Sequence, residues 1–309
     1  MDFNMKHIIS INDFQREEID YILDQSKKME ELPQKDKIEL FKGKVMASLF
    51  FEPSTRTKDS FISACLKMGG NHVGFSDTSS TSLKKGETFA DTIRMYEKYS
   101  DILVIRHSIE GAARYASEIL SIPVINGGDG ANQHPTQTLL DLYSIKKSKG
   151  SIDNNNILIA GDLKYGRTVH SLSLALSLFD NINLTFVSPP SLRMPDEITE
   201  MLRNRGVSFS IYDNLEEAVR DNDIIYMTRI QRERFPNGAE YERVKNSYLI
   251  DRELLERCPT DIRIMHPLPR VGEISTEVDH MPQALYFQQA ANGIPVRQSL
   301  LMLLTGGVL

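Results

Sequence analysis

The chain has 309 residues, of which 40% are hydrophobic and 25% are charged. A chain of this length usually folds as two domains, and its apolar share excludes a disordered protein. Its 36 Lys and Arg residues against 42 Asp and Glu residues give a net charge of −6, which argues against a general surface for nucleic acid or anionic membranes. Because Cys65 and Cys258 are the only cysteines, the sequence predicts neither a disulfide framework nor a zinc site.

The N-terminus and the apolar stretches give no sign of export or membrane insertion. The opening residues MDFNMKHIIS lack the apolar core of a signal peptide. The most apolar segment, Ser171–Phe179, is too short and too rich in serine to span a bilayer. We therefore expect a cytoplasmic protein.

Apolar runs followed by helical patterns recur along the whole chain. Buried strands are predicted at Lys44–Phe51, Asp101–Ile105, Pro123–Asn126, Ile157–Gly161, Asn183–Val187, Val207–Ile211 and Asp223–Met227. Arg263–Arg270 is predicted as a strand that ends in a proline-locked turn. Helices are predicted from Pro53 to Gly69, around Gly111–Leu120, around Leu139–Ile145, and at Val169–Phe179, Pro195–Arg205, Leu215–Arg220 and Gln289–Leu304. The polar stretch Lys146–Asn156 is the best candidate for a linker. The pattern predicts an α/β fold of two doubly wound parallel-sheet domains, with ligands at the carboxyl ends of the strands.

The sharpest local motif is FFEPSTRTKDSF, Phe50–Phe61, in which a strand, a turn and a helix start follow one another. Backbone N–H groups at a helix start favour an anion, and Ser54, Thr55 and Thr57 add hydroxyl donors. Arg56 adds a planar fork that fits a phosphate. The alternative is that Ser54 only caps the helix and that Arg56 pairs with Glu52. No GxxxxGK[ST] pattern precedes the helix, which disfavours ATP hydrolysis.

Further polar groups follow other predicted elements. Arg106 comes directly after a strand, so its side chain is expected in the ligand crevice. In NQHPTQTLLDLY, His134 and Gln137 are three residues apart and can face one site, where they suit a carbamoyl group. Helix capping with a satisfied histidine is the alternative there. Lys84 and Lys85 fall in a polar turn and by themselves indicate only a solvated surface.

The second half carries two more candidate anion sites. Its segment GDLKYGRTVHSL is not a GxGxxG motif, and VSPP replaces the acid that a nicotinamide-binding unit needs, so that cofactor is disfavoured. Arg167 with Thr168, and Arg229 with Gln231, suggest a substrate with two carboxylates. A surface network with Glu233 is the alternative for Arg229. The two prolines of HPLPR can aim the carbonyls of Leu268 and Pro269 at a ligand, although for this motif by itself a plain strand exit is the better explanation.

The motifs STRT, SxxKGE, Arg106, HPTQ, GRT, TRIQ and HPLPR stand in one order along almost the whole chain. Together they resemble the aspartate/ornithine carbamoyltransferase family, and within it the aspartate branch. The ornithine branch typically carries HCLP where this chain has HPLP, and a DxxxSMG segment for a cationic amino acid. Arg229 and Gln231 in TRIQ suit a dicarboxylate instead.

The resemblance implies a role for each matching position. Ser54, Thr55, Arg56 and Thr57 would bind the phosphate of carbamoyl phosphate; Thr57, Arg106 and His134 its carbonyl oxygen; and Gln137 and the carbonyls of Leu268 and Pro269 its amide nitrogen. Arg167, Thr168, Arg229 and Gln231 would bind aspartate. Ser82 and Lys85 would reach in from a neighbouring subunit, and Lys84 remains an alternative to Lys85 as the source of the ammonium.

The resemblance also implies the organisation of the protein. It implies a carbamoyl phosphate-binding domain of residues 1–134 plus 289–309, an aspartate-binding domain of residues 135–288, and an active site between them. A homotrimer in de novo pyrimidine biosynthesis is implied, without a cofactor or a catalytic metal, and a separate regulatory chain remains open. A dehydrogenase and a nonenzymatic protein with the same fold are the alternatives from other classes.

Overall fold

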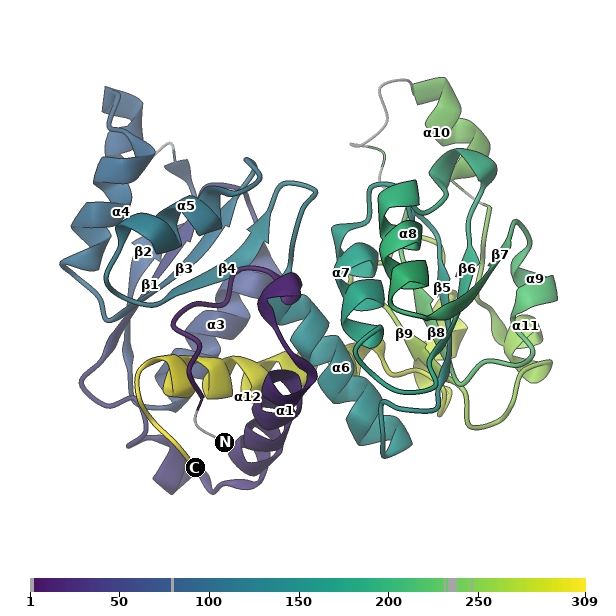
Figure 1. Ribbon diagram of the computed structural model, residues 1–309, viewed down its shortest axis with the longest axis horizontal. Coiled ribbons are helices and arrows are strands. Elements are labelled where there is room, and N and C mark those ends of the chain that lie inside the picture. The colour runs from purple at the N-terminus through teal and green to yellow at the C-terminus, as the bar shows by residue number, and fades with distance from the viewer. Residues whose placement is uncertain (1–2, 79–80, 231, 233–237, 246) are drawn as a thin grey trace. The chain divides into compact units, whose positions relative to one another are not determined.

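The structure is a computed structural model that describes residues 3–78, 81–230, 232, 238–245 and 247–309. The chain divides into two compact units (Figure 1). The first unit is Met1–Tyr143 with Asn292–Leu309, and the second is Ser144–Ala291. Both chain crossings between the units fall inside helices, α6 (Pro135–Lys149) and α12 (Tyr286–Leu304).

The first unit is built on a parallel sheet of four strands in the order β2-β1-β3-β4. The strands are β1 (Val45–Phe50), β2 (Asn71–Phe75), β3 (Ile102–His107) and β4 (Val124–Asp129). The three strands predicted in this half are confirmed as β1, β3 and β4. The fourth, β2, was not predicted because it is an edge strand whose NHVGF sequence has no buried residue and hence no apolar signal.

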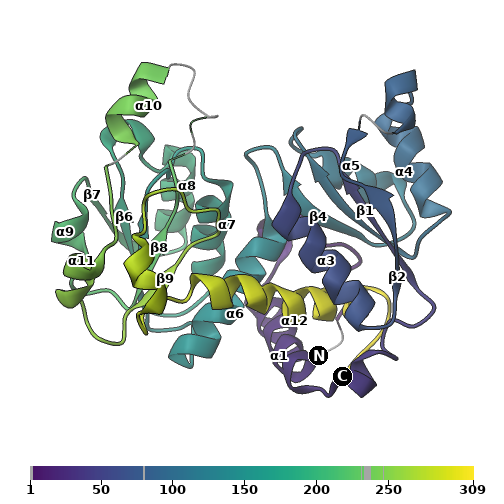
Figure 2. The same cartoon turned by 180° about the vertical axis from the view of Figure 1, so that it is seen from behind.

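Helices cover both faces of this sheet (Figures 1 and 2). The helices α4 (Phe89–Glu97) and α5 (Ala112–Ile119) lie on one face, and α1 (Arg16–Glu31), α3 (Thr55–Lys67) and the end of α12 lie on the other. A four-residue helix, α2 (Gln34–Lys37), follows α1. Alternate residues of β1 and β3 pack under α4 and α5, namely Ala47, Leu49, Leu103 and Ile105 against Ile93, Ala113 and Ala116.

The second unit contains a parallel sheet of five strands in the order β7-β6-β5-β8-β9. Its strands are β5 (Asn156–Ala160), β6 (Asn183–Val187), β7 (Ser208–Tyr212), β8 (Ile224–Met227) and β9 (Arg263–Met265). The helices α7 (Arg167–Leu176) and α8 (Asp196–Asn204) lie on one face, and α9 (Leu215–Ala218) and α11 (Arg252–Glu256) on the other (Figure 1). Helix α10 (Gly238–Val244) lies between β8 and α11 in the chain. Two doubly wound parallel-sheet domains are therefore confirmed.

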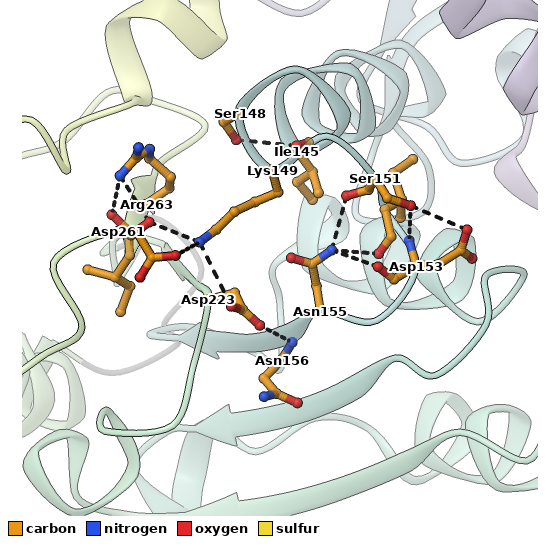
Figure 3. Close-up of polar contacts among 12 residues, drawn as sticks. Ile145, Ser148, Lys149, Ser151, Asp153, Asn155, Asn156, Asp223, Asp261 and Arg263 are labelled. Carbon is orange, nitrogen blue, oxygen red and sulfur yellow. Dashed lines mark hydrogen bonds and ion pairs between the residues drawn. The ribbon is translucent and has the colours of Figure 1, made fainter.

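One predicted segment ends as expected and another differs in extent. The strand within Arg263–Arg270 ends at Met265, ahead of the proline-locked turn, because Pro267 and Pro269 have no N–H to continue a ladder. The polar stretch expected as a linker begins with the last turn of α6, so that prediction is wrong for Lys146–Lys149. The Nζ atom of Lys149 contacts Asp261 Oδ2 at 3.1 Å and Asp223 Oδ1 at 3.8 Å (Figure 3). These contacts tie the end of α6 to the starts of β8 and β9.

The turn between α6 and β5 is also well connected. The side-chain amide of Asn155 donates to the carbonyl oxygens of Ser151, Ile152 and Asp153 (Figure 3). Three hydrogen bonds from one buried amide fix the turn. A composition rich in Asn, Ser and Lys therefore predicted the loop between α6 and β5 but not the hydrogen bonds that hold it.

No helix in the described part of the chain is long and apolar enough to cross a membrane. Both cysteines are free thiols, and burial raises the pKa of Cys65 to about 11.

Candidate active site

The sheet of the first unit changes winding direction between β1 and β3, because α3 after β1 and α4 before β3 lie on opposite faces. In doubly wound folds, ligands bind at the carboxyl ends of the strands that flank such a point. In the register of the sheet, Phe50 at the end of β1 is opposite Arg106 of β3. The STRT segment follows β1, so two of the predicted groups meet at this edge.

The STRT segment forms the start of α3. Ser54 is the N-cap residue in extended conformation, yet its hydroxyl makes no capping hydrogen bond. Thr55 and Arg56 are exposed in the first turn, whereas Thr57 is only 8% exposed. Simple capping by the Ser54 hydroxyl is thus not what the structure shows. The start of a helix such as α3 favours an anion.

Arg106 is held in place by two groups of the same unit. Its Nη2 lies 3.2 Å from Glu52 Oε2, and its Nη1 donates to the carbonyl of Gly127 at 3.2 Å. The sequence offered Glu52 only as a partner for Arg56 and did not suggest this ion pair. Because Glu52 precedes α3 and Gly127 is in β4, Arg106 bridges the segments on either side of β3.

His134 meets the STRT segment across a long sequence separation. Its Nε2 lies 3.5 Å from the hydroxyl of Thr57, 77 residues earlier in the chain, and the His134 side chain is 5% exposed. The HPTQ motif forms the start of α6, and Gln137 is half-buried in its first turn. The structure therefore brings STRT, Arg106 and HPTQ to one edge of the first sheet.

Asp129 organises the loop that carries His134. Its buried carboxylate accepts hydrogen bonds from the side chains of Asn126 and Asn132 and from the backbone N–H groups of Gly111 and Gln133, at 2.9–3.1 Å. Four donors around one carboxylate fix the turn from β4 into α6. The sequence contained a signal for this residue, a GGDG turn five residues before the histidine, but its role was not predicted.

We expect Asp129→Ala to destabilise the chain by about 3 kcal/mol, because it leaves several buried donors unsatisfied at roughly 1–3 kcal/mol each before relaxation. Asp129→Asn should be milder, since the amide oxygen still accepts. Urea unfolding of both variants measures the change. A loss below about 0.5 kcal/mol for the alanine variant, the level of an ordinary surface substitution, would contradict this role.

Among the described residues, Ser82 and Lys85 make no contact with these groups. They lie in a single 3₁₀ turn, Ser82–Lys85, and both are exposed, as is Lys84. The turn ends at Gly86, whose φ of 88° is left-handed. No described contact links Ser82 or Lys85 to STRT, Arg106 or HPTQ.

The second sheet changes winding direction between β5 and β8, and the residues predicted in GRT and TRIQ follow these strands. The Thr228 hydroxyl donates to the carbonyl of Ala160 and accepts from the N–H of Asp162, so it joins the two strand ends. Gly161 is required here, because its φ is 114° and a Cβ would lie 2.2 Å from the Thr228 carbonyl oxygen.

The two arginines of the second unit lie just beyond these strand ends. Arg167 is the first residue of α7, with Thr168 beside it, and both are half-buried. Arg229 follows Thr228 directly and is also half-buried. Gln231, the remaining predicted residue of TRIQ, lies outside the described residues.

His266 shapes the HPLP turn. Its Nδ1 accepts a hydrogen bond from the N–H of Leu268 at 2.7 Å, so its Nε2 carries the proton and donates to Glu273 at 2.7 Å. Leu268 has a left-handed φ of 56° and a cis bond to Pro269. The two hydrogen bonds of His266 therefore connect both sides of this turn.

The pKa values of this pair are both low. Burial lowers the pKa of His266, against the effect of Glu273. Burial alone would raise the pKa of Glu273, but hydrogen bonds from His266 and the Gly272 N–H outweigh it and lower the pKa to about 2. Burial also lowers the pKa values of four other histidines, His7, His72, His107 and His170.

We therefore expect the urea midpoint to fall between pH 7 and pH 5.5. Below their ordinary pKa of 6.5 the unfolded chain binds more protons on these histidines than the folded chain, in which their pKa values are lowered, so stability is lost as the pH falls. Glu273 adds a second loss between pH 4.5 and about 2. An unchanged or rising midpoint from pH 7 to pH 5.5 would contradict the neutral, buried histidines.

Comparison with known proteins decides the family. The model described as "Aspartate/ornithine carbamoyltransferase, carbamoyl-P binding domain" matches residues 6–147, and that described as "Aspartate/ornithine carbamoyltransferase, Asp/Orn binding domain" matches residues 153–304. The chain belongs to the aspartate/ornithine carbamoyltransferase family. The family resemblance of the seven motifs is thus confirmed, and the enzyme is a carbamoyltransferase.

Relatives within the family match over nearly their whole length. The aspartate carbamoyltransferase catalytic subunit of Thermococcus gammatolerans is 53% identical over 99% of both chains. The solved catalytic subunit of M. jannaschii aspartate transcarbamoylase is 52% identical, with a TM-score of 0.90 over 96% of this chain and 97% of the other. An aspartate transcarbamoylase of Trypanosoma cruzi, solved in complex with carbamoyl phosphate and aspartate, is 37% identical, with a TM-score of 0.91 over 97% of both chains.

Proposed function

We propose that this carbamoyltransferase transfers the carbamoyl group of carbamoyl phosphate to the α-amine of L-aspartate, giving N-carbamoyl-L-aspartate and phosphate. The names of the relatives support aspartate as the acceptor. The structural observation that carries the proposal is the contact of the Thr57 hydroxyl with the His134 imidazole, at the sheet edge that also holds Arg106. Donors from three distant segments converge there, as a carbonyl oxygen that gains negative charge requires.

In the proposal, residues 1–134 plus 289–309 supply most of the carbamoyl phosphate site, and Gln137, Leu268 and Pro269 of residues 135–288 complete it. The first turn of α3 binds the phosphate through Ser54, Thr55, Arg56 and Thr57. Thr57, Arg106 and His134 donate to the carbonyl oxygen, and Arg106 is aimed by Glu52. Gln137 accepts a hydrogen bond from the amide nitrogen, together with the carbonyls of Leu268 and Pro269.

Residues 135–288 bind aspartate in the proposal. Arg167 and Arg229 clamp its two carboxylates, with Thr168 and Gln231 beside them. Arg167 begins the helix that follows β5, and Arg229 comes two residues after the end of β8. The second sheet changes winding direction between these two strands. A planar guanidinium can make two parallel hydrogen bonds to a carboxylate, which suits a dicarboxylic amino acid better than ornithine.

The proposed reaction needs positioned charges rather than an enzyme nucleophile. The neutral amine attacks the carbamoyl carbon and forms a C–N bond, while the carbonyl oxygen takes up the electron pair as an oxyanion. The oxyanion then reforms the carbonyl and expels phosphate, which accepts the proton of the amine. Thr57, Arg106 and His134 stabilise the oxyanion, and the α3 start stabilises the leaving phosphate.

A substrate-pair assay tests the proposal. Purified chain with carbamoyl phosphate and L-aspartate should release phosphate at a rate that saturates in both substrates, and mass spectrometry should detect N-carbamoyl-L-aspartate. L-Ornithine serves as the matched amine. Turnover with ornithine and none with aspartate would assign the chain to the other branch of the family.

We further propose that the active form is a homotrimer in which Ser82 and Lys85 of one subunit complete the site of the next. Both side chains are exposed and make no described contact with the other proposed residues of their own chain, which agrees with a role across an interface. Placement in the cytoplasm, at a step of de novo pyrimidine biosynthesis, and assembly with a separate regulatory chain belong to the same proposal. Size-exclusion chromatography with light scattering tests the trimer.

A mixing experiment tests the shared site. Lys85→Ala and Arg56→Ala should each be nearly inactive, but subunits mixed after dissociation should regain activity. Each mixed trimer has one interface that combines wild-type Lys85 with wild-type Arg56, and about three quarters of randomly assembled trimers are mixed. About a quarter of all sites are therefore restored. Lys84→Ala is the matched control and should stay active. No gain on mixing would place both residues in the same subunit's site.

A further inference from the structure

Asp141 lies one helical turn after Gln137 on α6 and takes no part in the reaction proposed above. The Gln137 Nε2 donates a hydrogen bond to the Asp141 Oδ1 at 2.9 Å. The Asp141 side chain is fully buried, whereas Gln137 is half-buried. Residues four apart on a helix face the same side, so the contact follows directly from the local fold.

The chemistry of this contact fixes which end of the Gln137 amide is turned away from Asp141. An ionised carboxylate only accepts hydrogen bonds, so it can hold the NH₂ end of an amide but not its oxygen. Turning the amide over would place two acceptors against each other inside the protein. With its NH₂ end held by Asp141, Gln137 has its Oε1 free to accept from a ligand.

A buried cation of the same unit supports the ionised state of Asp141. Arg297 of α12 is 3% exposed, and its guanidinium lies 5.0 Å from the ring centroid of Phe61 in α3. Burial lowers the pKa of Arg297 to about 10 although Asp141 raises it, so the guanidinium is still charged at neutral pH. A positive charge near a buried carboxylate favours its charged form.

Gly293 leaves space for this arrangement. A Cβ at that position would lie 2.1 Å from the Arg297 Nη1. The absence of a side chain one turn before Arg297 therefore lets the guanidinium lie against α12.

We infer that Asp141 is a positioning residue that makes the site selective for a carbamoyl group over an acyl group. A carbamoyl phosphate carries an NH₂ group where acetyl phosphate carries a methyl group. An acceptor held in one orientation gains a hydrogen bond only from the first, and a buried acceptor facing a methyl group is left unpaired. This inference rests on the proposed function, because Gln137 must face the carbamoyl nitrogen.

The test compares the Kd of carbamoyl phosphate with that of acetyl phosphate, measured by calorimetry on the full chain. Asp141→Asn keeps the shape but lets either end of the Asn amide face Gln137, so the orientation of Gln137 is no longer fixed. We expect the preference for carbamoyl phosphate to fall about tenfold, mainly through its own Kd, which corresponds to about 1.4 kcal/mol. The Kd of acetyl phosphate should change less than about twofold.

Two comparisons separate positioning from a general structural effect. Tyr143→Phe removes another hydrogen bond of α6, that from the Tyr143 hydroxyl to Glu30 at 2.6 Å, and should leave the preference unchanged. In a Gln137→Ala background, Asp141→Asn should have no further effect on the preference, because Asp141 acts through Gln137. An equal loss for both ligands, or an effect that persists without Gln137, would overturn the inference.

The variant pair Asp141→Asn with Arg297→Met covers the case in which Asp141→Asn alone does not fold. It removes both charges together, so no buried cation is left without its carboxylate. The preference should fall in this pair as well, and an unchanged preference would overturn the inference. Turnover of the wild-type chain, measured on the same preparation, keeps the two claims apart: its absence contradicts the proposed function, whereas an unchanged preference contradicts only the role of Asp141.

Discussion

Replacing Arg56 with alanine is expected to lower kcat by at least about 10²-fold, the usual cost of losing one preplaced charge-stabilising donor. Arg56 is in the first turn of α3, where its guanidinium and the helix N–H groups would stabilise the charge that builds on the leaving phosphate. Steady-state rates at saturating substrates measure the effect. The fold should be intact, because the Arg56 side chain is exposed.

Two further variants define what Arg56 contributes. Arg56→Lys keeps the charge but loses the planar fork, so it should recover only part of the rate. Arg114→Ala removes another partly exposed arginine of the same unit, one that pairs with Asp13, and should leave kcat unchanged. Near-normal turnover in Arg56→Ala would remove Arg56 from the mechanism.

Arg229→Ala is expected to raise the KM for aspartate by about 10²-fold, since hydrogen bonds to a charged partner contribute roughly 1.5–3 kcal/mol. The Kd of carbamoyl phosphate should change little, because Arg229 follows β8 in the second unit and the phosphate groups lie in the first. Initial rates with each substrate varied in turn separate the two effects.

The control for Arg229 must account for its neighbourhood. The positive charge of Arg229 lowers the pKa of His266, whose ring accepts a hydrogen bond from Leu268 in the HPLP turn. If the substitution disturbed this turn, carbamoyl phosphate binding would also weaken. Arg193→Ala removes an exposed arginine of the same unit that pairs with Asp213, and should affect neither substrate. Equal losses for both substrates in Arg229→Ala would contradict its assignment to aspartate.

Every strand of the two sheets except β2 could be predicted from the sequence, because most buried parallel strands are continuous apolar runs. The missed elements differ in cause. In β2 the apolar signal is absent. Helix α1, in contrast, carries a helical spacing of buried residues that the sequence shows but that was not used to predict it, namely Ile19, Ile22, Leu23, Ser26 and Met29. The end of α6 was misread because a helix end and a loop share a polar composition.

The candidate site divides in the same way. Residues that would contact a ligand could be proposed from short motifs, because their side-chain chemistry suits the ligand. The residues that position those side chains could not be predicted in this way. Glu52, just after β1, pairs with Arg106 of β3, and Glu273 orients His266 across a turn. Only the folded chain creates these contacts. Asp141 lies within a motif already noticed, and its spacing from Gln137 was the available clue.

The most direct measurement is a crystal structure of the chain with N-(phosphonacetyl)-L-aspartic acid, the compound bound in a solved Trypanosoma cruzi relative. We predict that its phosphonate lies at the start of α3 beside Arg56 and Thr57, that its carbonyl oxygen is within hydrogen-bond distance of His134, and that its carboxylates contact Arg167 and Arg229. A complex in which the compound binds with these side chains turned to other surfaces would contradict the proposed site.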